Sequence, residues 1–338
     1  MPITKLNLVG FTVFEHLEMT FSEGINVFIG ENGTGKTHLL KLLYAACQAS
    51  RRDVSFEDKL GKVFRPKEMK LGRLVRRVKG GSGMAAIEVS IKDASLHTDI
   101  SIKAGSSRGV HTRGEEQWKE NFPGSSAFIP AKEILSHSYN FLEAHRAGNI
   151  DFDDTYADII AYSKVDIRKG PESPHRKLFL KDLESLVSGT VKVDRDVFYL
   201  QQKHGGPLEF SLVAEGIRKL ALLWMLIKNG TLEKDAVLFW DEPEANINPS
   251  AIPVVVGILL ALEREGVQIF IATHNYILLK AIDLRKKRDS RIVYHSCYRE
   301  QDAVKTNSFA EMHQISPNPI IDAYAMLMDE SVHAELGN

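Results

Sequence analysis

The segment Gly30-Glu-Asn-Gly-Thr-Gly35-Lys36-Thr37 says more about the architecture of this chain than any other stretch. It fits the pattern Gly-x4-Gly-Lys-Ser/Thr. It follows the short apolar run Ile25–Ile29 and opens Gly35–Gln48, where leucines recur at helical spacing. Glycines allow backbone N–H groups to approach an anion without a Cβ in the way. The helix N-terminus adds the positive end of its dipole. The segment therefore predicts a phosphate-binding loop between a strand and a helix.

The residue types within this loop suit a nucleoside triphosphate with a divalent cation. Lys36 offers a mobile positive charge to the β- and γ-phosphates, and the Thr37 hydroxyl is a hard oxygen suited to Mg²⁺. We therefore expect ATP and Mg²⁺ as ligands. The residues expected to bind the nucleotide from this side are Glu31, Asn32, Gly33, Thr34, Gly35, Lys36, Thr37 and His38.

Two other apolar runs end in polar side chains. Asp241 and Glu242 follow Ala236–Trp240, and His274 follows Phe270–Thr273. In a parallel sheet, ligands lie beyond the carboxyl ends of the strands, where the phosphate loop also lies. We expect Asp241 to hold Mg²⁺ through water and Glu242 to act as general base on the attacking water. His274 is expected to hydrogen-bond to the γ-phosphate, so that Glu242, His274 and Lys36 form the catalytic set.

Composition and charge exclude several classes of protein. The 338 residues include 43 Lys and Arg against 44 Asp and Glu, a net charge of −1, and only two cysteines. These values argue against a globally basic nucleic-acid binder and against a disulfide framework. No apolar run reaches the roughly 18 residues that a membrane span needs, and no secretory signal is evident at the N-terminus. We expect a cytoplasmic protein with no membrane partner.

Three motifs together resemble the ABC-type ATPase heads of the SMC, RecF-like and OLD group. They are the phosphate loop, Asp241-Glu-Pro-Glu-Ala-Asn-Ile-Asn-Pro249 and Ala272-Thr-His-Asn275. The resemblance covers Met1–Ala46 and about Phe210–His295. It implies an α/β P-loop NTPase fold, with a mixed sheet flanked by helices, N-terminal antiparallel strands and a helical insertion. It also implies ATP hydrolysis and a homodimer or higher oligomer that forms on ATP, in which two heads enclose two nucleotides.

The resemblance also suggests how the chain is divided. We expect residues 1–52 and 191–300 to form the ABC-type ATPase core, 53–130 a basic segment with antiparallel strands, 131–190 a helical insertion and 301–338 a C-terminal tail helix.

The chain departs from that group at two motifs. The group's signature, which completes the partner's site at the start of a helix, matches Ala214, Glu215 and Gly216, but its serine is replaced by Ala214. The group's glutamine loop corresponds to a stretch near Phe128–Glu133, which contains no glutamine. Because both motifs normally touch the nucleotide or Mg²⁺, an ATP-gated scaffold with little hydrolysis remains an alternative.

The biological role is open among several alternatives. Sixty-four residues follow His274, too few for the nuclease domain of OLD proteins. We therefore expect the chain to control a separate effector protein, such as a nuclease, in an anti-phage defence module. A RecF-like DNA-repair ATPase is the second alternative. A transporter subunit is a third, although the residues after Asp241 resemble the SMC group instead.

Two basic clusters and the C-terminal segment complete the prediction. Nine Lys and Arg face three acidic residues between Glu57 and Lys79, and Arg285-Lys-Lys-Arg288 forms a second cluster. Such clusters fit either contacts to a phosphate backbone or solvated surface. The amphipathic segment from Pro319 is expected to pack on the chain's own sheet rather than to bind a partner.

Overall fold

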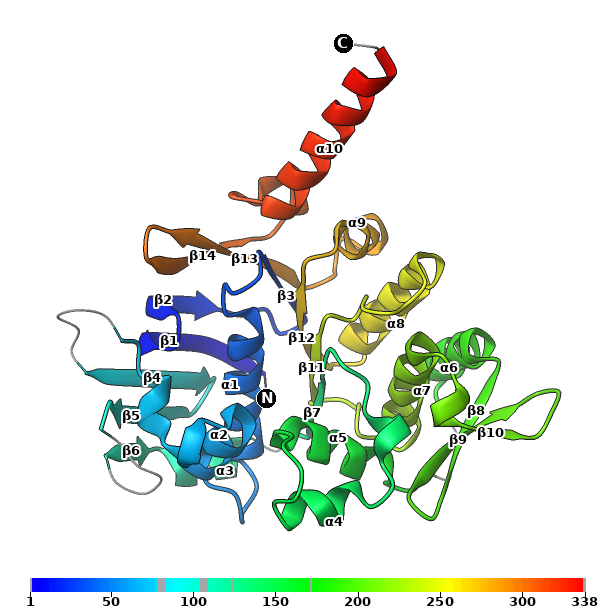
Figure 1. Ribbon diagram of the computed structural model, residues 1–338, viewed down its shortest axis with the longest axis horizontal. Coiled ribbons are helices and arrows are strands. Elements are labelled where there is room, and N and C mark those ends of the chain that lie inside the picture. Colours follow the sequence, from blue (N-terminus) through cyan, green and yellow to red (C-terminus); the bar gives the residue numbers. More distant parts are fainter. Residues whose placement is uncertain are drawn as a thin grey trace.

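The computed structural model describes residues 2–77, 83–103, 109–122, 124–168, 170 and 172–336. Lys79, which belongs to the first basic cluster, lies outside them. Within these ranges, no helix is both long enough and apolar enough to cross a membrane. Two large sheets stand side by side with helices between and around them (Figure 1).

The central sheet has six strands in the order β14-β13-β3-β12-β11-β7. Its strands are β3 (Ile25–Gly30), β7 (Ser126–Ile129), β11 (Val237–Asp241), β12 (Gln268–Thr273), β13 (Ile292–Glu300) and β14 (Ala303–Phe309). All neighbouring pairs are parallel except β13 with β14. Every residue of β3, β7, β11 and β12 is buried, because both faces of the sheet are covered.

The second sheet is antiparallel and has the order β2-β1-β4-β5-β6. Its strands are β1 (Ile3–Phe11), β2 (Phe14–Thr20), β4 (Met84–Ile91), β5 (Ser95–Ser101) and β6 (Val110–Arg113). Burial alternates along β5, as expected for a sheet with one face in the core. Helix α1 (Lys36–Gln48) contacts the central sheet and shares one apolar core with this second sheet. Helices α2 (Phe56–Phe64) and α3 (Glu115–Asn121) lie beyond α1.

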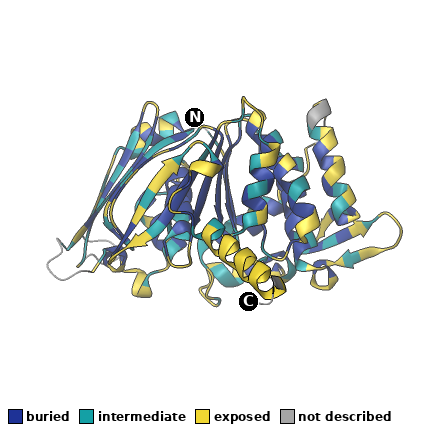
Figure 2. Cartoon of the chain, turned by 90° about the horizontal axis from the view of Figure 1, so that it is seen from above, coloured by how far each residue is buried: buried dark blue, intermediate teal, exposed yellow. Residues whose placement is uncertain are grey.

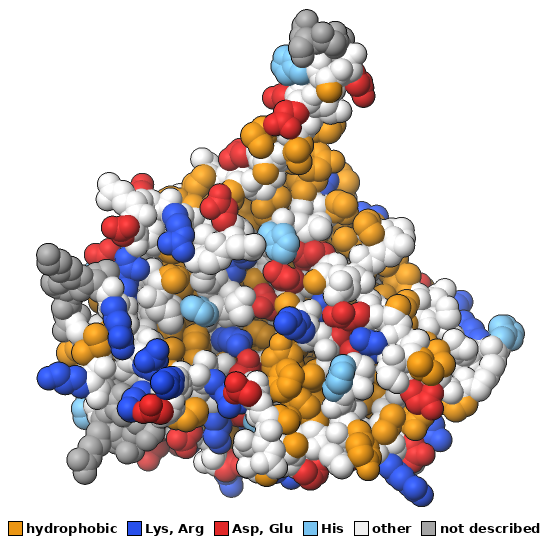
Figure 3. Space-filling model, viewed as in Figure 1, with side chains coloured by type: hydrophobic (Ala, Val, Ile, Leu, Met, Phe, Trp, Pro, Cys, Tyr) orange, Lys and Arg blue, Asp and Glu red, His pale blue; other side chains and the backbone are white. Residues whose placement is uncertain are grey.

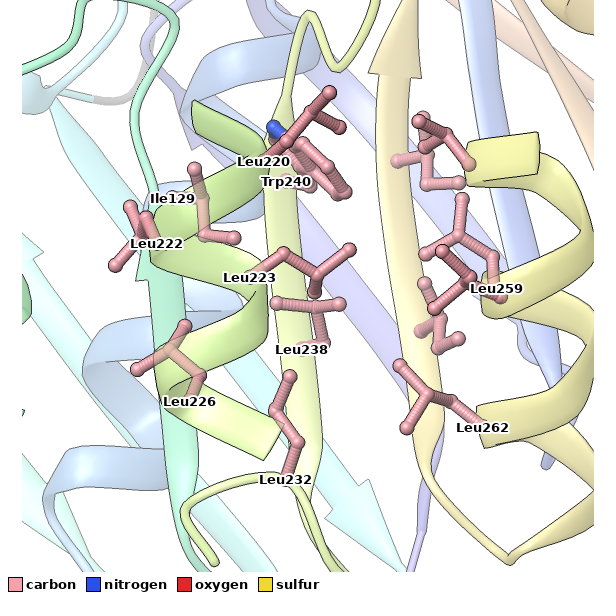
Figure 4. Close-up of a cluster of buried hydrophobic side chains, with 14 of the residues drawn as sticks. Ile129, Leu220, Leu222, Leu223, Leu226, Leu232, Leu238, Trp240, Leu259 and Leu262 are labelled. Carbon is pink, nitrogen blue, oxygen red and sulfur yellow. The ribbon is translucent and has the colours of Figure 1, made fainter. Parts of the chain in front are cut away.

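Helices cover the opposite face of the central sheet. They are α6 (Pro174–Val187), α7 (Glu215–Lys228) and α8 (Ile252–Arg264), and α9 (Tyr276–Arg285) follows β12. In Figure 4, Leu223 of α7 and Leu259 of α8 point toward Leu238 and neighbouring side chains on the sheet. This packing holds the carboxyl ends of β11 and β12 beside that of β3. Of the inserted helices, α5 (Asp154–Ser163) lies next to β7, and α4 (Phe141–Arg146) packs against α5.

The structure differs from the expectation in three places. A small sheet of β8 (Gly189–Asp194), β9 (Val197–Gln202) and β10 (Pro207–Glu209) precedes α7, where no strands were expected. Residues 301–338 are not only a tail helix, because β14 extends the central sheet before α10 (Pro319–Leu336) begins. The prediction that this helix packs on its own sheet is wrong for most of its length. Figures 1 and 2 show α10 projecting from the body with an exposed surface.

Candidate functional site

The phosphate loop joins β3 to α1 in a conformation that requires glycine. Gly30, Gly33 and Gly35 have φ values of 147°, 77° and 83°. A Cβ on Gly30 would lie 2.0 Å from the carbonyl oxygen of Cys297, and one on Gly35 would lie 2.7 Å from the Phe14 ring. Gly35 is also the N-cap of α1 and has no side chain with which to cap it. The first N–H groups of α1 are therefore left for an anion.

Lys36 lies folded over this loop. Its Nζ donates hydrogen bonds to the carbonyl oxygens of Gly30 at 2.8 Å and Glu31 at 2.9 Å. Thr34 Oγ1 donates to the same Glu31 oxygen at 2.8 Å, which fixes the loop's shape. Burial lowers the pKa of Lys36. Within the described residues, the Lys36 ammonium thus has only neutral backbone carbonyls as hydrogen-bond partners. A phosphate oxygen would be a charged and therefore stronger acceptor.

Thr37 and Asp241 meet although 204 positions separate them. Thr37 Oγ1 donates to Asp241 Oδ2 at 2.9 Å, and its distance to Oδ1 is 3.2 Å. Asp241 is 8% exposed. Burial is the main reason that its pKa rises to about 6, the hydrogen bond from Thr37 opposes the rise, and Glu242 adds to it. A cation beside this carboxyl would restore its charged form.

This pair fits Mg²⁺ that arrives with a triphosphate. Mg²⁺ in such sites takes one or two protein oxygens, and phosphates and waters supply the rest. Among the described residues there is no group of three His, Cys, Asp or Glu side chains that could hold a metal by itself. The hydroxyl of Thr37 and the carboxylate of Asp241 are the oxygens available at the end of the phosphate loop.

We expect Asp241→Asn to stabilise the protein when Mg²⁺ and nucleotide are absent. Folding raises the pKa of this carboxyl from 3.8 to about 6. Keeping this buried carboxylate charged therefore lowers the free energy of unfolding. The loss is fully present above pH 6 and disappears as the pH falls to about 4. Two pKa units correspond to at most about 3 kcal/mol. The free energy of unfolding in urea should increase by about 1–3 kcal/mol at pH 8 and by less than half as much at pH 4.5. Equal increases at both pH values would contradict this origin.

Glu242 and His274 come together at the same edge of the sheet. Glu242 Oε1 lies 3.3 Å from His274 Nδ1, and the two side chains are 34% and 50% exposed. Glu242 has a φ of 48°, and its N–H donates to the carbonyl oxygen of Ala272 at 2.9 Å. A positive φ in a non-glycine residue is a strained conformation that persists only where the surroundings enforce it. Both side chains thus reach the surface beyond the carboxyl ends of β11 and β12.

Glu244 is a residue of this site that the sequence analysis missed. Its Oε1 accepts hydrogen bonds from Thr273 Oγ1 at 2.6 Å and from the His274 N–H at 3.4 Å. Burial raises the pKa of Glu244. The side chain ties the loop after β11 to the turn that carries His274. The sequence shows that Glu244 follows Glu242 by two residues. This spacing does not predict a hydrogen bond with Thr273, which lies 29 positions further along the chain.

The signature residues lie at the start of α7, with Ala214 as its N-cap. A Cβ on Gly216 would lie 2.1 Å from the carbonyl oxygen of Asn246, so glycine allows the loop after β11 to pass closely. Lys219 is completely buried and donates to the carbonyl oxygen of Ala245 at 3.0 Å. Among the described residues, no hydrogen bond or ion pair joins Ala214, Glu215 or Gly216 to the phosphate loop of the same chain.

A buried ion pair occupies the position expected for the glutamine loop. Strand β7 pairs in parallel with β11, and Glu133 follows it. The Glu133 carboxylate pairs with Arg218 of α7 and accepts a hydrogen bond from Ser136 Oγ at 2.9 Å. The Glu133 side chain is 1% exposed. The start of α7 is thereby held to the segment after β7 by charge, and Arg218 faces its own chain.

A strand, a glycine loop with Lys and Thr, a helix, and an acidic strand end two strands away in the same sheet define a P-loop nucleotide-binding protein. Two family models match the chain. The model described as "AAA domain, putative AbiEii toxin, Type IV TA system" matches residues 119–280, and one described as "AAA domain" matches residues 5–154.

Curated relatives and solved structures agree with this class. The RecF DNA replication and repair protein of Streptococcus suis is 32% identical over 101 residues, which are 30% of this chain and 26% of the relative. The RecF protein of Cytophaga hutchinsonii is 49% identical over 47 residues, 14% of this chain and 12% of the relative. The chain thus matches about a quarter or less of these relatives' length.

Solved SMC heads share the fold at low sequence identity. One, solved bound to the C-terminal winged-helix domain of ScpA, gives a TM-score of 0.61 at 11% identity and covers 93% of this chain and 99% of that chain. The head from Pyrococcus yayanosii gives 0.55 at 10% identity, covering 91% of this chain and 97% of that chain. The chain therefore has the fold of solved SMC heads, and parts of it are similar to AAA domains and to RecF proteins.

Proposed function

We propose that this chain binds and hydrolyses ATP, dimerises on the nucleotide and controls a separate effector in a cytoplasmic anti-phage defence module. The observation that carries the catalytic part is the hydrogen bond between Thr37 and Asp241. It places the end of the phosphate loop against the acidic strand end from which Glu242 emerges. The description of the matching AAA model as a putative AbiEii toxin supports the defence role.

The proposed chemistry is mainly positioning and electrostatic stabilisation. Loop N–H groups and Lys36 hold the phosphates, and Thr37 and Asp241 hold Mg²⁺, which neutralises phosphate charge when bound. Glu242 orients a water molecule toward the γ-phosphate and accepts its proton. His274, 3.3 Å from Glu242, donates a hydrogen bond to the γ-phosphate and responds to its loss.

The proposed dimer follows from the position of the signature. Within the residues that the structure describes, Ala214, Glu215 and Gly216 form no hydrogen bond or ion pair with their own chain's phosphate loop. Backbone N–H groups at the start of α7 are suited to a phosphate of a second copy's nucleotide. Arg218 and Lys219 are engaged within their own chain, so these backbone groups are the donors that remain.

The purified chain tests this proposal directly. We expect phosphate release from ATP that requires Mg²⁺, and a doubling of mass when ATP is added to a hydrolysis-deficient variant. A chain that doubles in mass without releasing phosphate would instead be the ATP-gated scaffold. A chain that does neither would overturn the proposal.

A DNA-binding role is a second proposal, which the RecF matches support. The first basic cluster is less available than its sequence suggests. Lys59 is buried between Asp154 and Asp158, and Arg76 donates to the carbonyl oxygens of Val13 and Asp302. The exposed cations without an ion pair among the described residues of this run include Lys67, Arg73 and Arg77. Figure 3 shows Lys and Arg side chains gathered on this side of the molecule.

We expect the triple variant Lys67→Glu, Arg73→Glu, Arg77→Glu to separate these two proposals. If DNA is a ligand, duplex DNA stimulates ATP turnover by the wild-type chain and the variant loses this stimulation, because backbone contacts are electrostatic. The matched control reverses the exposed Lys181 and Lys192 elsewhere on the chain. Turnover that is unaffected by DNA in all three proteins would exclude the DNA role and leave the effector role.

A further inference from the structure

Helix α10 exposes an apolar surface that the described residues of its own chain leave uncovered. Among its side chains, Tyr324 is 46%, Leu327 60%, Met328 57% and Val332 52% exposed. Tyr324, Met328 and Val332 recur at helical spacing, while Asp322 lies seven positions from Asp329 on another side. Figure 3 shows hydrophobic side chains continuing from the body along this helix. Large exposed apolar surfaces of this kind mark interaction sites.

The helix emerges from the nucleotide edge of the sheet. It contacts β3, the strand that ends in the phosphate loop, and α9, which begins two residues after His274. The rings of Tyr324 and Tyr276 stack with their centroids 4.5 Å apart. The 18 residues of α10 span about 27 Å, so most of the helix extends past its own body. A second head that docks on this edge therefore meets α10.

The surface of α9 complements α10 in polarity and in charge. Ile277 and Leu284, seven positions apart on one face, are 42% and 68% exposed. Arg285, Lys287 and Arg288 follow Leu284, and none of the three has an ion pair among the described residues. The carboxylates of α10, at Asp322, Asp329, Glu330 and Glu335, likewise have none in the part of the chain that the structure describes, and α10 contains no Lys or Arg.

A chain cannot satisfy this complementarity by itself. Its α10 reaches α9 at Tyr276, the first residue of that helix, whereas Leu284 and the three cations lie at the other end. We propose that two copies exchange their C-terminal helices, so that α10 of each copy packs on Leu284 and the basic end of α9 of the other. Such an exchange is isologous, because the same two surfaces meet twice. The proposal rests on the head-to-head dimer proposed above and adds the surface that stabilises it.

Cross-linking between chains tests the exchange. One tagged chain carries Met328→Cys and a differently tagged chain carries Leu284→Cys; the native Cys47 and Cys297 are both buried. After mixing with ATP and a short bismaleimide, we expect a covalent heterodimer. Leu178→Cys, exposed on α6, replaces Met328→Cys in the control and should cross-link at least tenfold less. Equal yields, or no heterodimer in either mixture, would overturn the exchange.

Charge reversal provides a second, independent measurement. Asp329→Lys with Glu330→Lys should weaken dimerisation at least tenfold, and so should Arg285→Glu with Arg288→Glu, while an equimolar mixture of the two variants should recover it. No recovery of dimerisation in the mixture would overturn the pairing of these charges. A purified chain that hydrolyses ATP as a monomer would also overturn the exchange, but it would leave the ATPase proposal standing. Cross-linking through α10 without phosphate release would support the exchange and overturn the hydrolysis.

Discussion

The Glu242→Gln protein should hydrolyse ATP roughly 10²–10⁴-fold more slowly than the wild-type chain and still bind it. Gln keeps the size of the side chain and its contact with His274, at 3.3 Å in the native chain, but it cannot accept a proton from water. Because Lys36, Thr37 and Asp241 are unchanged, the nucleotide site remains. ATP should therefore accumulate on the protein and hold it as a dimer.

Phosphate release and mass measured on the same samples check this expectation. The matched control is Glu209→Gln, an exposed glutamate on β10, which should change turnover by less than about twofold. If Glu242→Gln and Glu209→Gln release phosphate at equal rates, Glu242 is not the general base. A variant that loses ATP binding as well as turnover would place Glu242 in nucleotide binding instead.

The Lys36→Ala protein should bind ATP roughly 10- to 100-fold more weakly and lose measurable turnover. A hydrogen bond from an ammonium to a charged oxygen contributes about 1.5–3 kcal/mol, and here the ammonium also balances phosphate charge. Among the described residues, Lys36 Nζ donates hydrogen bonds only to the carbonyl oxygens of Gly30 and Glu31, so these contacts must be exchanged when phosphate binds. Calorimetric titration with a non-hydrolysable ATP analogue measures the affinity.

The control for this variant is Lys192→Ala, an exposed lysine on β8. Both variants should unfold within a few degrees of the wild-type chain, which separates a lost ligand contact from a lost fold. Unchanged affinity in Lys36→Ala would mean that the loop N–H groups alone hold the nucleotide.

The sequence predicted the fold class and most strands of the two large sheets, because strand–loop–helix units are local. Apolar and polar residues alternate along β4 and β5, which indicates strands with one buried face. Continuous apolar runs indicate strands buried on both faces, as in β3, β11 and β12. The small sheet of β8–β10 was not predicted, because at least half of the residues of β8 and β10 are exposed and these strands carry few apolar residues. Strand β14 was also missed, since its burial pattern is irregular. Its place in the sheet depends on pairing with β13.

What the sequence determined by itself is the phosphate loop, because its chemistry lies in eight consecutive residues whose backbone requires glycine. Only the tertiary structure decided how Thr37 meets Asp241 across 204 positions, that Glu244 holds the turn of His274, and that Glu133 pairs with Arg218. It also decided that α10 leaves the body. These contacts depend on how the helices pack against the sheet. An apolar stripe in the sequence predicts that one face of a helix is buried, but it does not predict which surface that face packs against.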